Sequence, residues 1–290
     1  MATRLYLVDG TFELFRAHYG AARDGRTPGP FDAVAGIVRS VTQLLSRHGA
    51  THVAVAFDHV IESFRNDLFA GYKSGEGIDP VLRAQFEPAE AAMTALGVVM
   101  WPMVEFEADD AIATAAARFG GEAEIVIASP DKDLMQCVRG THVTTWDRIR
   151  DRHFDDAAVR EKFGVGPASI PDFLALVGDT SDGIPGLPKW GEKSAAAVLA
   201  RWVHLDAIPD DHADWDCTVR GAPGLAATLR EQRENALLYR TLATLRTDVP
   251  LAETHLDALR WTSADLAALE GVAEACNDPG LLARVPAPRF

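Results

Sequence analysis

The sequence has little cysteine and no long apolar run. Its three cysteines are too few and too scattered for a disulfide framework or a zinc site: Cys137, Cys217 and Cys276. The longest apolar run, Leu96 to Val104, has nine residues and includes Pro102, whereas a membrane-spanning helix needs about 18. Asp9 interrupts the apolar stretch Leu5 to Val8, which is unlike a signal peptide. We therefore expect a soluble protein of the cytoplasm.

Positive charge is also scarce. The chain has 42 acidic residues against 28 lysines and arginines, a formal net charge of −14 at pH 7. Only five of these bases are lysines: Lys73, Lys132, Lys162, Lys189 and Lys193. Such a balance ordinarily excludes a polyanion such as nucleic acid as a partner. The exclusion fails if many acids converge on one site where divalent cations neutralise them.

The rest of the composition is that of a folded protein. A hydrophobic fraction of 48% in 290 residues is enough for one large domain or two ordinary ones. Four short runs rich in β-forming residues predict strands: Leu5–Val8, His52–Phe57, Glu124–Ala128 and His142–Thr145. Segments with helical period, such as Ala33–Arg47 and Glu87–Leu96, separate the first three. This alternation predicts an α/β fold with a largely parallel sheet.

Beyond about residue 155, helical patterns dominate: Ala157–Phe163, Pro171–Val177, Ser194–Val203 and Gly224–Leu245. We place a domain boundary near residue 169, so that an α/β domain (1–169) precedes a helical one (170–251). The turn residues and acids of segment 204–223 predict a linker or surface loop. Residues 252–290 carry no motif and are predicted to form a tail of unknown role.

Acidic residues follow the predicted strands. Asp9 ends the first strand, Asp58 ends the second, and Asp131 and Asp133 come directly after the third. Because ligands of an open parallel sheet bind at the carboxyl ends of its strands, these acids should meet at one edge. Two further groups begin or end predicted helices: Glu107, Asp109 and Asp110, and Asp179 and Asp182.

Each of these nine acids has an ordinary explanation when taken alone. An aspartate after a strand is a common turn residue, and acids in the first turn of a helix favour its dipole. Together, however, nine crowded carboxylates would repel one another strongly unless cations are bound. Without these nine acids, the chain has 33 acids against 28 bases, a net charge of −5. Ligands that are all oxygen favour Mg²⁺ or Mn²⁺ over zinc, and a two-metal carboxylate cluster is the usual apparatus of phosphodiester hydrolysis.

The acids stand in short motifs spread over most of the chain: Leu5-Tyr-Leu-Val-Asp-Gly, Phe57-Asp, Ser63-Phe-Arg, Gly71-Tyr-Lys-Ser, Leu82-Arg-Ala-Gln, Glu107-Ala-Asp-Asp, Asp131-Lys-Asp, Phe173-Leu-Ala-Leu-Val-Gly-Asp, Ser181-Asp, Gly183-Ile-Pro-Gly, Gly191-Glu-Lys-Ser-Ala and Leu242-Ala-Thr-Leu-Arg-Thr-Asp-Val-Pro-Leu. In this order they resemble the 5′-nuclease family, which includes the 5′→3′ exonuclease domain of bacterial DNA polymerase I and the flap endonucleases. The resemblance covers roughly residues 4 to 251. It implies a PIN-like nuclease domain with an arch or gateway at about residues 60–90, then a helix-hairpin-helix (helix-three-turn-helix) domain.

The resemblance also implies a role for each acid. The first divalent cation would have three ligands: Asp58, Glu107 and Asp109. Asp9 would act on this cation largely through bound water. The second cation would have three further ligands: Asp131, Asp133 and Asp182. Asp110 and Asp179 would complete the acidic pocket, so that every acidic position of the family pattern is filled.

Basic residues would handle the substrate. By the resemblance, Lys73 would stabilise charge at the scissile phosphate and Arg65 would contact a phosphate, with Arg83 in the same segment. The hairpin would hold duplex DNA and, as often in the family, K⁺: Gly183, Ile184, Gly186, Lys189, Gly191, Lys193 and Ser194. Lys189 and Trp190 stand where relatives have a glycine and an aliphatic residue. Glu76 stands where relatives usually have an arginine.

The residues and the resemblance together predict a structure-selective 5′→3′ exonuclease and flap endonuclease. It would hydrolyse DNA phosphodiesters in replication and repair, removing flaps or RNA primers, as a monomer that binds no membrane. Two alternatives stay open. One is an RNA-directed nuclease of the PIN-like fold, which the hairpin disfavours. The other is a catalytically silent binder of branched DNA, which would gain nothing from keeping nine acids.

Overall fold

The computed structural model describes residues 3–23 and 27–288, and their contacts divide the chain into two compact units. Unit 1 comprises Met1–Ser63, Gly75–Ser129 and Thr247–Phe290, and unit 2 comprises Phe64–Ser74 and Pro130–Arg246. The chain thus passes from unit 1 to unit 2 and back twice. The predicted domains (1–169, 170–251 and 252–290) were defined by sequence motifs, and their boundaries differ from those of the two contact-based units. The domain boundaries stay a prediction. Among the described residues, no helix has the length and apolar character needed to cross a membrane.

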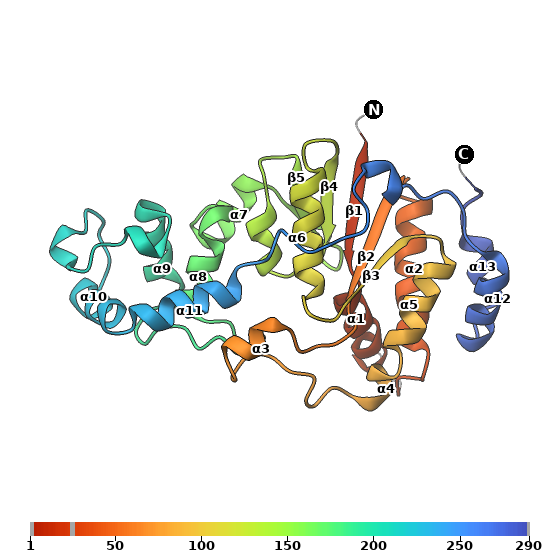
Figure 1. The fold of residues 1–290 in the computed structure, drawn as a ribbon, viewed down its shortest axis with the longest axis horizontal. Coiled ribbons are helices and arrows are strands. Elements are labelled where there is room, and N and C mark those ends of the chain that lie inside the picture. Colours follow the sequence, from red (N-terminus) through yellow and green to blue (C-terminus); the bar gives the residue numbers. More distant parts are fainter. Residues whose placement is uncertain (1–2, 24–26, 289–290) are drawn as a thin grey trace. The chain divides into compact units, whose positions relative to one another are not determined.

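Unit 1 is built on four parallel strands (Figure 1). They are β1(Arg4–Asp9), β2(His52–Asp58), β3(Val99–Met103) and β4(Glu124–Ala128), in the order β3-β2-β1-β4. The register sets Asp9 opposite Ala56, so that β1 and β2 end their pairing at the same edge. All of β2 is buried, as expected for a parallel strand covered on both faces. The predicted parallel sheet is confirmed.

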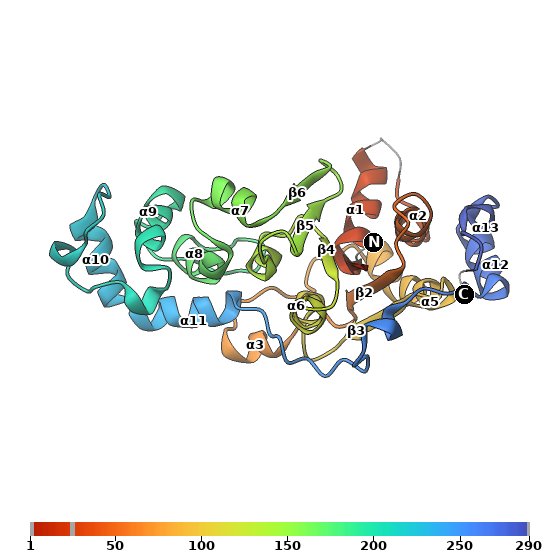
Figure 2. The ribbon, with the colours of Figure 1, turned by 90° about the horizontal axis from the view of Figure 1, so that it is seen from above.

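Helices cover both faces of these strands: α1(Gly10–Arg23), α2(Asp32–Ser46), α4(Pro80–Arg83), α5(Phe86–Ala95) and α6(Ala108–Phe119). Figure 2 shows α6 on one side of the strands and α1 and α2 on the other. The buried face of α6 is mostly alanine, which lets this helix lie close to the sheet. This close packing fixes the first turn of α6, where Glu107, Asp109 and Asp110 stand.

Two parts of unit 1 were not predicted from the sequence. Strand β3 contains Pro102, which is tolerated because β3 is the outer member of the four parallel strands. The segment after residue 251 is not a loose tail, since it forms η5(Leu256–Leu259), α12(Leu266–Ala275) and α13(Leu281–Arg284) within unit 1. Trp261 anchors it, 1% exposed, with its indole N–H donating to the Leu96 carbonyl at 2.8 Å.

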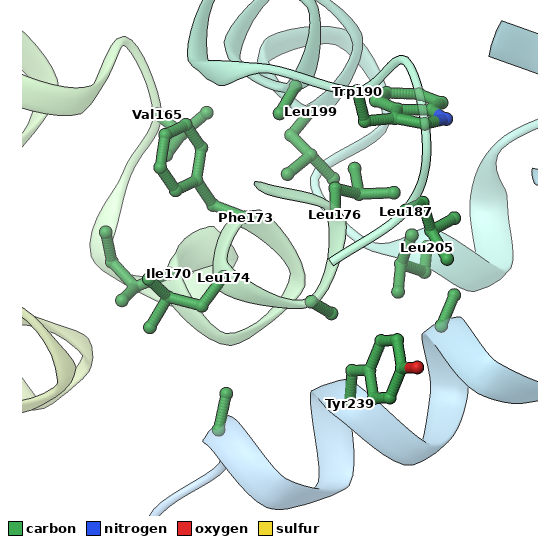
Figure 3. Packing of buried hydrophobic residues seen from close by; sticks show 14 of the residues in the cluster. Val165, Ile170, Phe173, Leu174, Leu176, Leu187, Trp190, Leu199, Leu205 and Tyr239 are labelled. Carbon is green, nitrogen blue, oxygen red and sulfur yellow. The ribbon is translucent and has the colours of Figure 1, made fainter. Parts of the chain in front are cut away.

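Unit 2 is mainly helical. It contains α3(Phe64–Leu68), η1(Asp133–Cys137), the antiparallel pair β5(Val143–Asp147) and β6(Arg152–Phe154), α7(Asp156–Phe163), η2(Pro167–Ser169), α8(Ile170–Val177), α9(Glu192–Trp202), η3(Leu205–Ala207), η4(His212–Asp214), α10(Ala222–Glu231) and α11(Arg233–Ala243). Figure 3 shows its core, where side chains of α8, α9 and α11 converge. Leu176, Leu187 and Tyr239 meet there beside the hairpin that joins α8 to α9.

One prediction for this unit needs correction. The helical stretch predicted over Gly224–Leu245 is two helices, separated at Gln232 (φ −119°). Arg233 donates to the carbonyls of Leu205 and Ile208, both at 3.1 Å, which ties the start of α11 to the preceding segment. That segment, predicted as a linker or surface loop, contains two short 3-10 helices and is anchored by the buried Trp215.

Candidate metal centre and hairpin

The carboxyl end of β1 carries Asp9, which is buried and held in place by two donors. Its Oδ1 accepts from the backbone N–H of Phe12 at 2.8 Å, at the start of α1. Its Oδ2 accepts from the Ser129 hydroxyl at 3.0 Å, directly after β4. Two adjacent parallel strands therefore fix this carboxylate at the sheet edge where the sequence predicts it.

Asp58, Glu107 and Asp110 are linked by hydrogen bonds within unit 1. Asp58 Oδ1 accepts from the Ala108 N–H at 2.8 Å, and Asp110 Oδ2 accepts from the Glu107 N–H at 3.0 Å. The Ser63 hydroxyl donates to Glu107 Oε1 at 2.7 Å. Together with the half-buried Asp109, the acids of unit 1 form the first acid group: Asp9, Asp58, Glu107, Asp109 and Asp110. Each bond to a main-chain donor at a strand end or helix start fixes the orientation of its carboxylate.

The four remaining acids lie in unit 2 and form the second acid group: Asp131, Asp133, Asp179 and Asp182. Asp133, Asp179 and Asp182 each offer one carboxylate oxygen, and these three atoms lie within 4.8 Å of one another. Asp131 Oδ1 accepts from the Asp133 N–H at 2.9 Å. Asp179 is held by reciprocal backbone hydrogen bonds with Ile184, both 2.8 Å, which place it at the base of the hairpin.

The second acid group has the properties of a cation site. Asp133 is 5% exposed, and its Oδ1 is buried with no hydrogen-bond partner among the described residues. Burial, reinforced by the charges of Asp131, Asp182 and Asp179, raises the pKa of Asp133 well above its ordinary value. A buried acceptor without a donor, amid like charges, is stabilised by a positive ion. The residues present therefore fit a divalent cation with oxygen ligands.

Two lysines adjoin this group. Lys73 Nζ lies 3.3 Å from Asp182 Oδ1, and the Lys73 N–H donates to the Asp182 carbonyl at 3.0 Å. Lys132 Nζ lies 2.9 Å from Asp179 Oδ1. Burial disfavours the charged form of Lys132, but Asp179 and the neighbouring acids outweigh it and raise the pKa of this lysine. The sequence analysis assigned no role to Lys132, although its place between Asp131 and Asp133 was a signal.

Arg65 has a setting that the sequence did not indicate. Its side chain is fully buried, and its guanidinium lies over the Phe64 ring at 4.6 Å from the centroid. Its Nε donates to the Leu242 carbonyl at 2.8 Å, and a terminal nitrogen donates to the Thr244 carbonyl at 3.0 Å. These bonds satisfy carbonyls at the end of α11. Arg65 thus has a structural role, and its phosphate contact stays a prediction.

Arg83 lies in unit 1, where it ends α4 and is exposed. It lines a cavity of about 390 Å³ together with His59 and Phe86. His59, which lines the same cavity, directly follows Asp58 of the first acid group in sequence. Its predicted contact with DNA stays a prediction.

The glycines of the hairpin are required by close packing. Gly183 has φ +75°, and a Cβ there would lie 2.1 Å from the Gly71 carbonyl oxygen. Gly186 has φ +70°, and a Cβ would lie 2.5 Å from the Gly178 nitrogen. A side chain at Gly183 would therefore push the hairpin from the segment that carries Lys73, and one at Gly186 would push it from the end of α8. Ile184 between them is buried in the core of unit 2.

The two unusual residues of the hairpin keep its shape. Lys189 adopts φ +72°, the left-handed conformation for which a glycine is usual, so that the turn is retained despite the substitution. Trp190 is buried, and its indole N–H donates to the Leu225 carbonyl at 3.3 Å. At the start of α9, the Gly191 N–H donates to the Ser194 hydroxyl at 3.0 Å. Lys193 in the first turn of α9 is exposed.

Comparison with known families matches almost the whole chain. The model of the 5′-3′ exonuclease N-terminal resolvase-like domain matches residues 4–164, and that of the 5′-3′ exonuclease C-terminal SAM fold matches residues 165–267. The chain belongs to the 5′-3′ exonuclease family. The predicted family and fold class are thereby confirmed.

Related proteins agree with this assignment. A 5′-3′ exonuclease of Buchnera aphidicola is 31% identical over 247 residues, covering 84% of this chain and 82% of that protein. DNA polymerase I of Pseudomonas aeruginosa is 39% identical over 266 residues, covering 88% of this chain but only 28% of the polymerase. The chain therefore spans less than a third of the polymerase relatives that it matches.

Solved structures share the fold. T5 5′-exonuclease with bound divalent metal ions (zinc) superposes with a TM-score of 0.67 at 18% identity, covering 98% of this chain and all of the other. The catalytic core of Rad2 in complex with DNA superposes with a TM-score of 0.65 at 15% identity, covering 97% and 92%. The whole fold, with a sheet-based part followed by a helical part, is therefore shared with these solved structures.

Proposed function

We propose that the chain is a metal-dependent, structure-selective 5′→3′ exonuclease and flap endonuclease that hydrolyses DNA phosphodiesters. Its work would be the removal of flaps or RNA primers in replication and repair, in the cytoplasm and as a monomer. The second acid group carries the proposal, because carboxylate oxygens of Asp133, Asp179 and Asp182, one from each, lie within 4.8 Å of one another. In addition, Asp133 Oδ1 is buried without a hydrogen-bond partner among the described residues. A T5 flap endonuclease of the same fold, captured with DNA and metal ions, supports it.

The proposal gives each acid group one divalent cation, Mg²⁺ or Mn²⁺. In the first group Asp58, Glu107 and Asp109 would be ligands and Asp9 would act through water. In the second group Asp131, Asp133 and Asp182 would be ligands. Asp110 in the first group and Asp179 in the second would be the remaining acids of the two sites. When bound, the two cations would lower the pKa of the attacking water and neutralise charge on the scissile phosphate.

Lys73 would act as an electrostatic catalyst. Its ammonium lies 3.3 Å from Asp182 and over the Tyr72 ring, 5.7 Å from the centroid, so that its position is fixed before substrate binds. A fixed cation needs no reorganisation as negative charge grows on the phosphate. Lys132 would orient Asp179 through the ion pair of 2.9 Å between its Nζ and Asp179 Oδ1.

The hairpin would hold the duplex part of the substrate. Main-chain N–H groups at the start of α9, with Lys189 and Lys193, offer donors to phosphates without reading sequence. A K⁺ ion at the turn is part of this proposal. Few basic side chains are needed to bind DNA, because the divalent ions would neutralise the acids that otherwise repel it.

The test uses the purified chain with four end-labelled substrates: a 5′-flap duplex, a nicked duplex, single-stranded DNA and an RNA hairpin. We expect cleavage near the flap junction that requires Mg²⁺ or Mn²⁺, leaves 5′-phosphate and 3′-hydroxyl ends, and is far slower on single strands and RNA. Preferred cleavage of RNA would point to the RNA-directed alternative. Tight flap binding without cleavage in any divalent ion would point to a silent binder.

A further inference from the structure

A cavity of about 810 Å³ lies beside the hairpin of unit 2. Two segments far apart in sequence line it: residues 189–197, at the turn and start of α9, and residues 218–221, directly before α10. Figure 1 and Figure 2 both show the starts of these helices in the same part of unit 2. The second segment belongs to the region that the sequence predicted to be a linker, and no role was assigned to it.

The lining of this cavity is positively charged. Lys189, Lys193 and Arg220 line it, against one acid, Glu192. All three cations are exposed, and in the part of the chain that the structure describes none of them lies within 4.0 Å of a carboxylate. Nearby arginines differ, since Arg201 pairs with Asp216 and Arg233 pairs with Asp210, each at 2.7 Å. Unpaired cations that converge on one cavity, in a chain of net charge −14, indicate an anionic ligand.

The segment that carries Arg220 is held against the hairpin by aromatic packing. The Trp215 ring lies 6.2 Å from the Trp190 ring and 6.0 Å from the Trp202 ring, centroid to centroid. The Trp215 indole N–H donates to the Pro209 carbonyl at 2.9 Å. Trp190, the unusual residue of the turn, thus anchors the segment that follows α9. This contact holds Trp215, three residues before the segment 218–221, against the turn.

Lys189 crosses from the turn to the start of α10. Its Cδ and Nζ lie 3.7 and 3.8 Å from the position that a Cβ would take at Gly224. Gly221, with φ +80°, precedes α10, so the chain turns sharply between Arg220 and the helix. The first N–H groups of α9 lie on the other wall of the cavity and have no partner within their helix. Basic side chains of both segments and the N–H donors at the start of α9 therefore line the cavity.

The lining also indicates the kind of anion. No aromatic side chain is among the residues that line it, whereas sites for single strands stack bases on aromatic rings. Its donors suit phosphate oxygens, and its volume is that of a site for more than one small anion. We propose that Arg220, from the segment 218–221, binds a second phosphate of duplex DNA across this cavity from Lys189 and Lys193. The proposal rests on the function proposed above and extends the hairpin's grip along the duplex.

The test is equilibrium binding of a fluorescent blunt duplex to the full chain in Ca²⁺, titrated with KCl. Arg220→Ala should weaken binding about tenfold at 0.1 M salt, as expected for one charge-assisted contact. The slope of log K against log salt should become shallower by about 0.9. Arg220→Lys should keep most of the slope. The matched control is Arg230→Ala, an exposed arginine in the last turn of α10 outside the cavity, which should leave both quantities unchanged.

Flap cleavage separates this proposal from the one on which it rests. Arg220→Ala should raise KM with kcat and the melting temperature unchanged, because Arg220 is exposed and binds only the duplex. A wild-type chain that does not cleave DNA would overturn the proposed function. A wild-type chain that cleaves, with wild-type duplex affinity and salt slope in Arg220→Ala, would overturn the Arg220 contact alone. A third outcome is that inorganic phosphate displaces duplex DNA better than chloride does at equal ionic strength, and that this difference is lost in Arg220→Ala. The cavity would then be a site for small anions, and the duplex proposal would be overturned.

Discussion

Asp133 combines burial, like-charged neighbours and an oxygen without a hydrogen-bond partner among the described residues. Because its negative charge costs free energy without a cation, Asp133→Asn should raise the free energy of unfolding in EDTA by about 1–3 kcal/mol. The same variant should lose cleavage and much of the stabilisation that wild type gains from Mg²⁺. Urea unfolding with and without Mg²⁺ measures both effects. Lower stability in EDTA, or full activity in Mg²⁺, would contradict the assignment of Asp133 as a cation ligand.

Lys73 Nζ lies 3.3 Å from Asp182, a predicted cation ligand of the second acid group. Lys73→Ala should lower the single-turnover cleavage rate about 10²–10³-fold, because it removes one preorganised charge at the phosphate, while affinity for DNA falls much less. Lys162→Ala, a cation of unit 2 that packs on Phe154 and Phe163, is the matched control and should retain the rate. An unchanged rate with weaker binding would make Lys73 a simple surface contact.

The positions of the acids could be predicted because each one stands near the end of a strand or at one end of a helix, which short motifs reveal. The hydroxyls that hold them could not. Ser63 donates to Glu107, 44 residues away, and Ser129 donates to Asp9, 120 residues away, with no local pattern that marks either one. Lys132 lay inside a recognised motif and was overlooked because its two acidic neighbours explained that motif.

At the scale of elements, Arg65 joins α3 to the end of α11, 177 residues later. Arg65→Ala should lower the free energy of unfolding by about 2–4 kcal/mol, since it removes the donor to the buried Leu242 carbonyl and to the carbonyl of Thr244. Arg65→Lys should recover part of this loss. Thermal and urea unfolding measure the effect. A stable Arg65→Ala variant with only weakened DNA binding would instead support the phosphate contact that the family resemblance implies.

The C-terminal segment should contribute to the stability of unit 1. Trp261 is 1% exposed and bonded to the Leu96 carbonyl, so Trp261→Ala should cost about 3–5 kcal/mol of the free energy of unfolding. Leu266→Ala is the control, because Leu266 on α12 is 55% exposed and should change stability by less than about 0.5 kcal/mol. A wild-type urea midpoint for Trp261→Ala would show that residues 252–290 do not support the nuclease unit.

Elements with a clear period were predicted, and those decided by distant packing were not. The strands β1, β2 and β4 and the helices α2, α5 and α6 follow the expected patterns closely. Strand β3 was missed because Pro102 is unfavourable in a strand unless the missing N–H faces away from a partner. The break between α10 and α11 depends on Arg233 reaching carbonyls near residue 205, which no local pattern encodes.

At the scale of the whole molecule, the net charge of −14 is reconciled with a DNA substrate by where the charges lie. Nine acids fall into two groups, one in each unit, whereas unpaired cations gather at the hairpin cavity. Divalent ions at the acid groups would turn a repulsive surface into an attractive one for the phosphate backbone. We therefore expect cleavage to depend on both acid groups and on a divalent metal ion.

The most direct measurement is the single-turnover rate of 5′-flap cleavage as a function of Mg²⁺ concentration for three chains: wild type, Asp58→Asn in the first acid group and Asp133→Asn in the second. We expect no cleavage by wild type in EDTA and a rate that rises more steeply than first order in Mg²⁺. Each variant should fall at least about 10²-fold at saturating Mg²⁺, as for loss of a group that stabilises the transition state. Cleavage by wild type in EDTA, or a wild-type rate in either variant, would contradict the two-cation account.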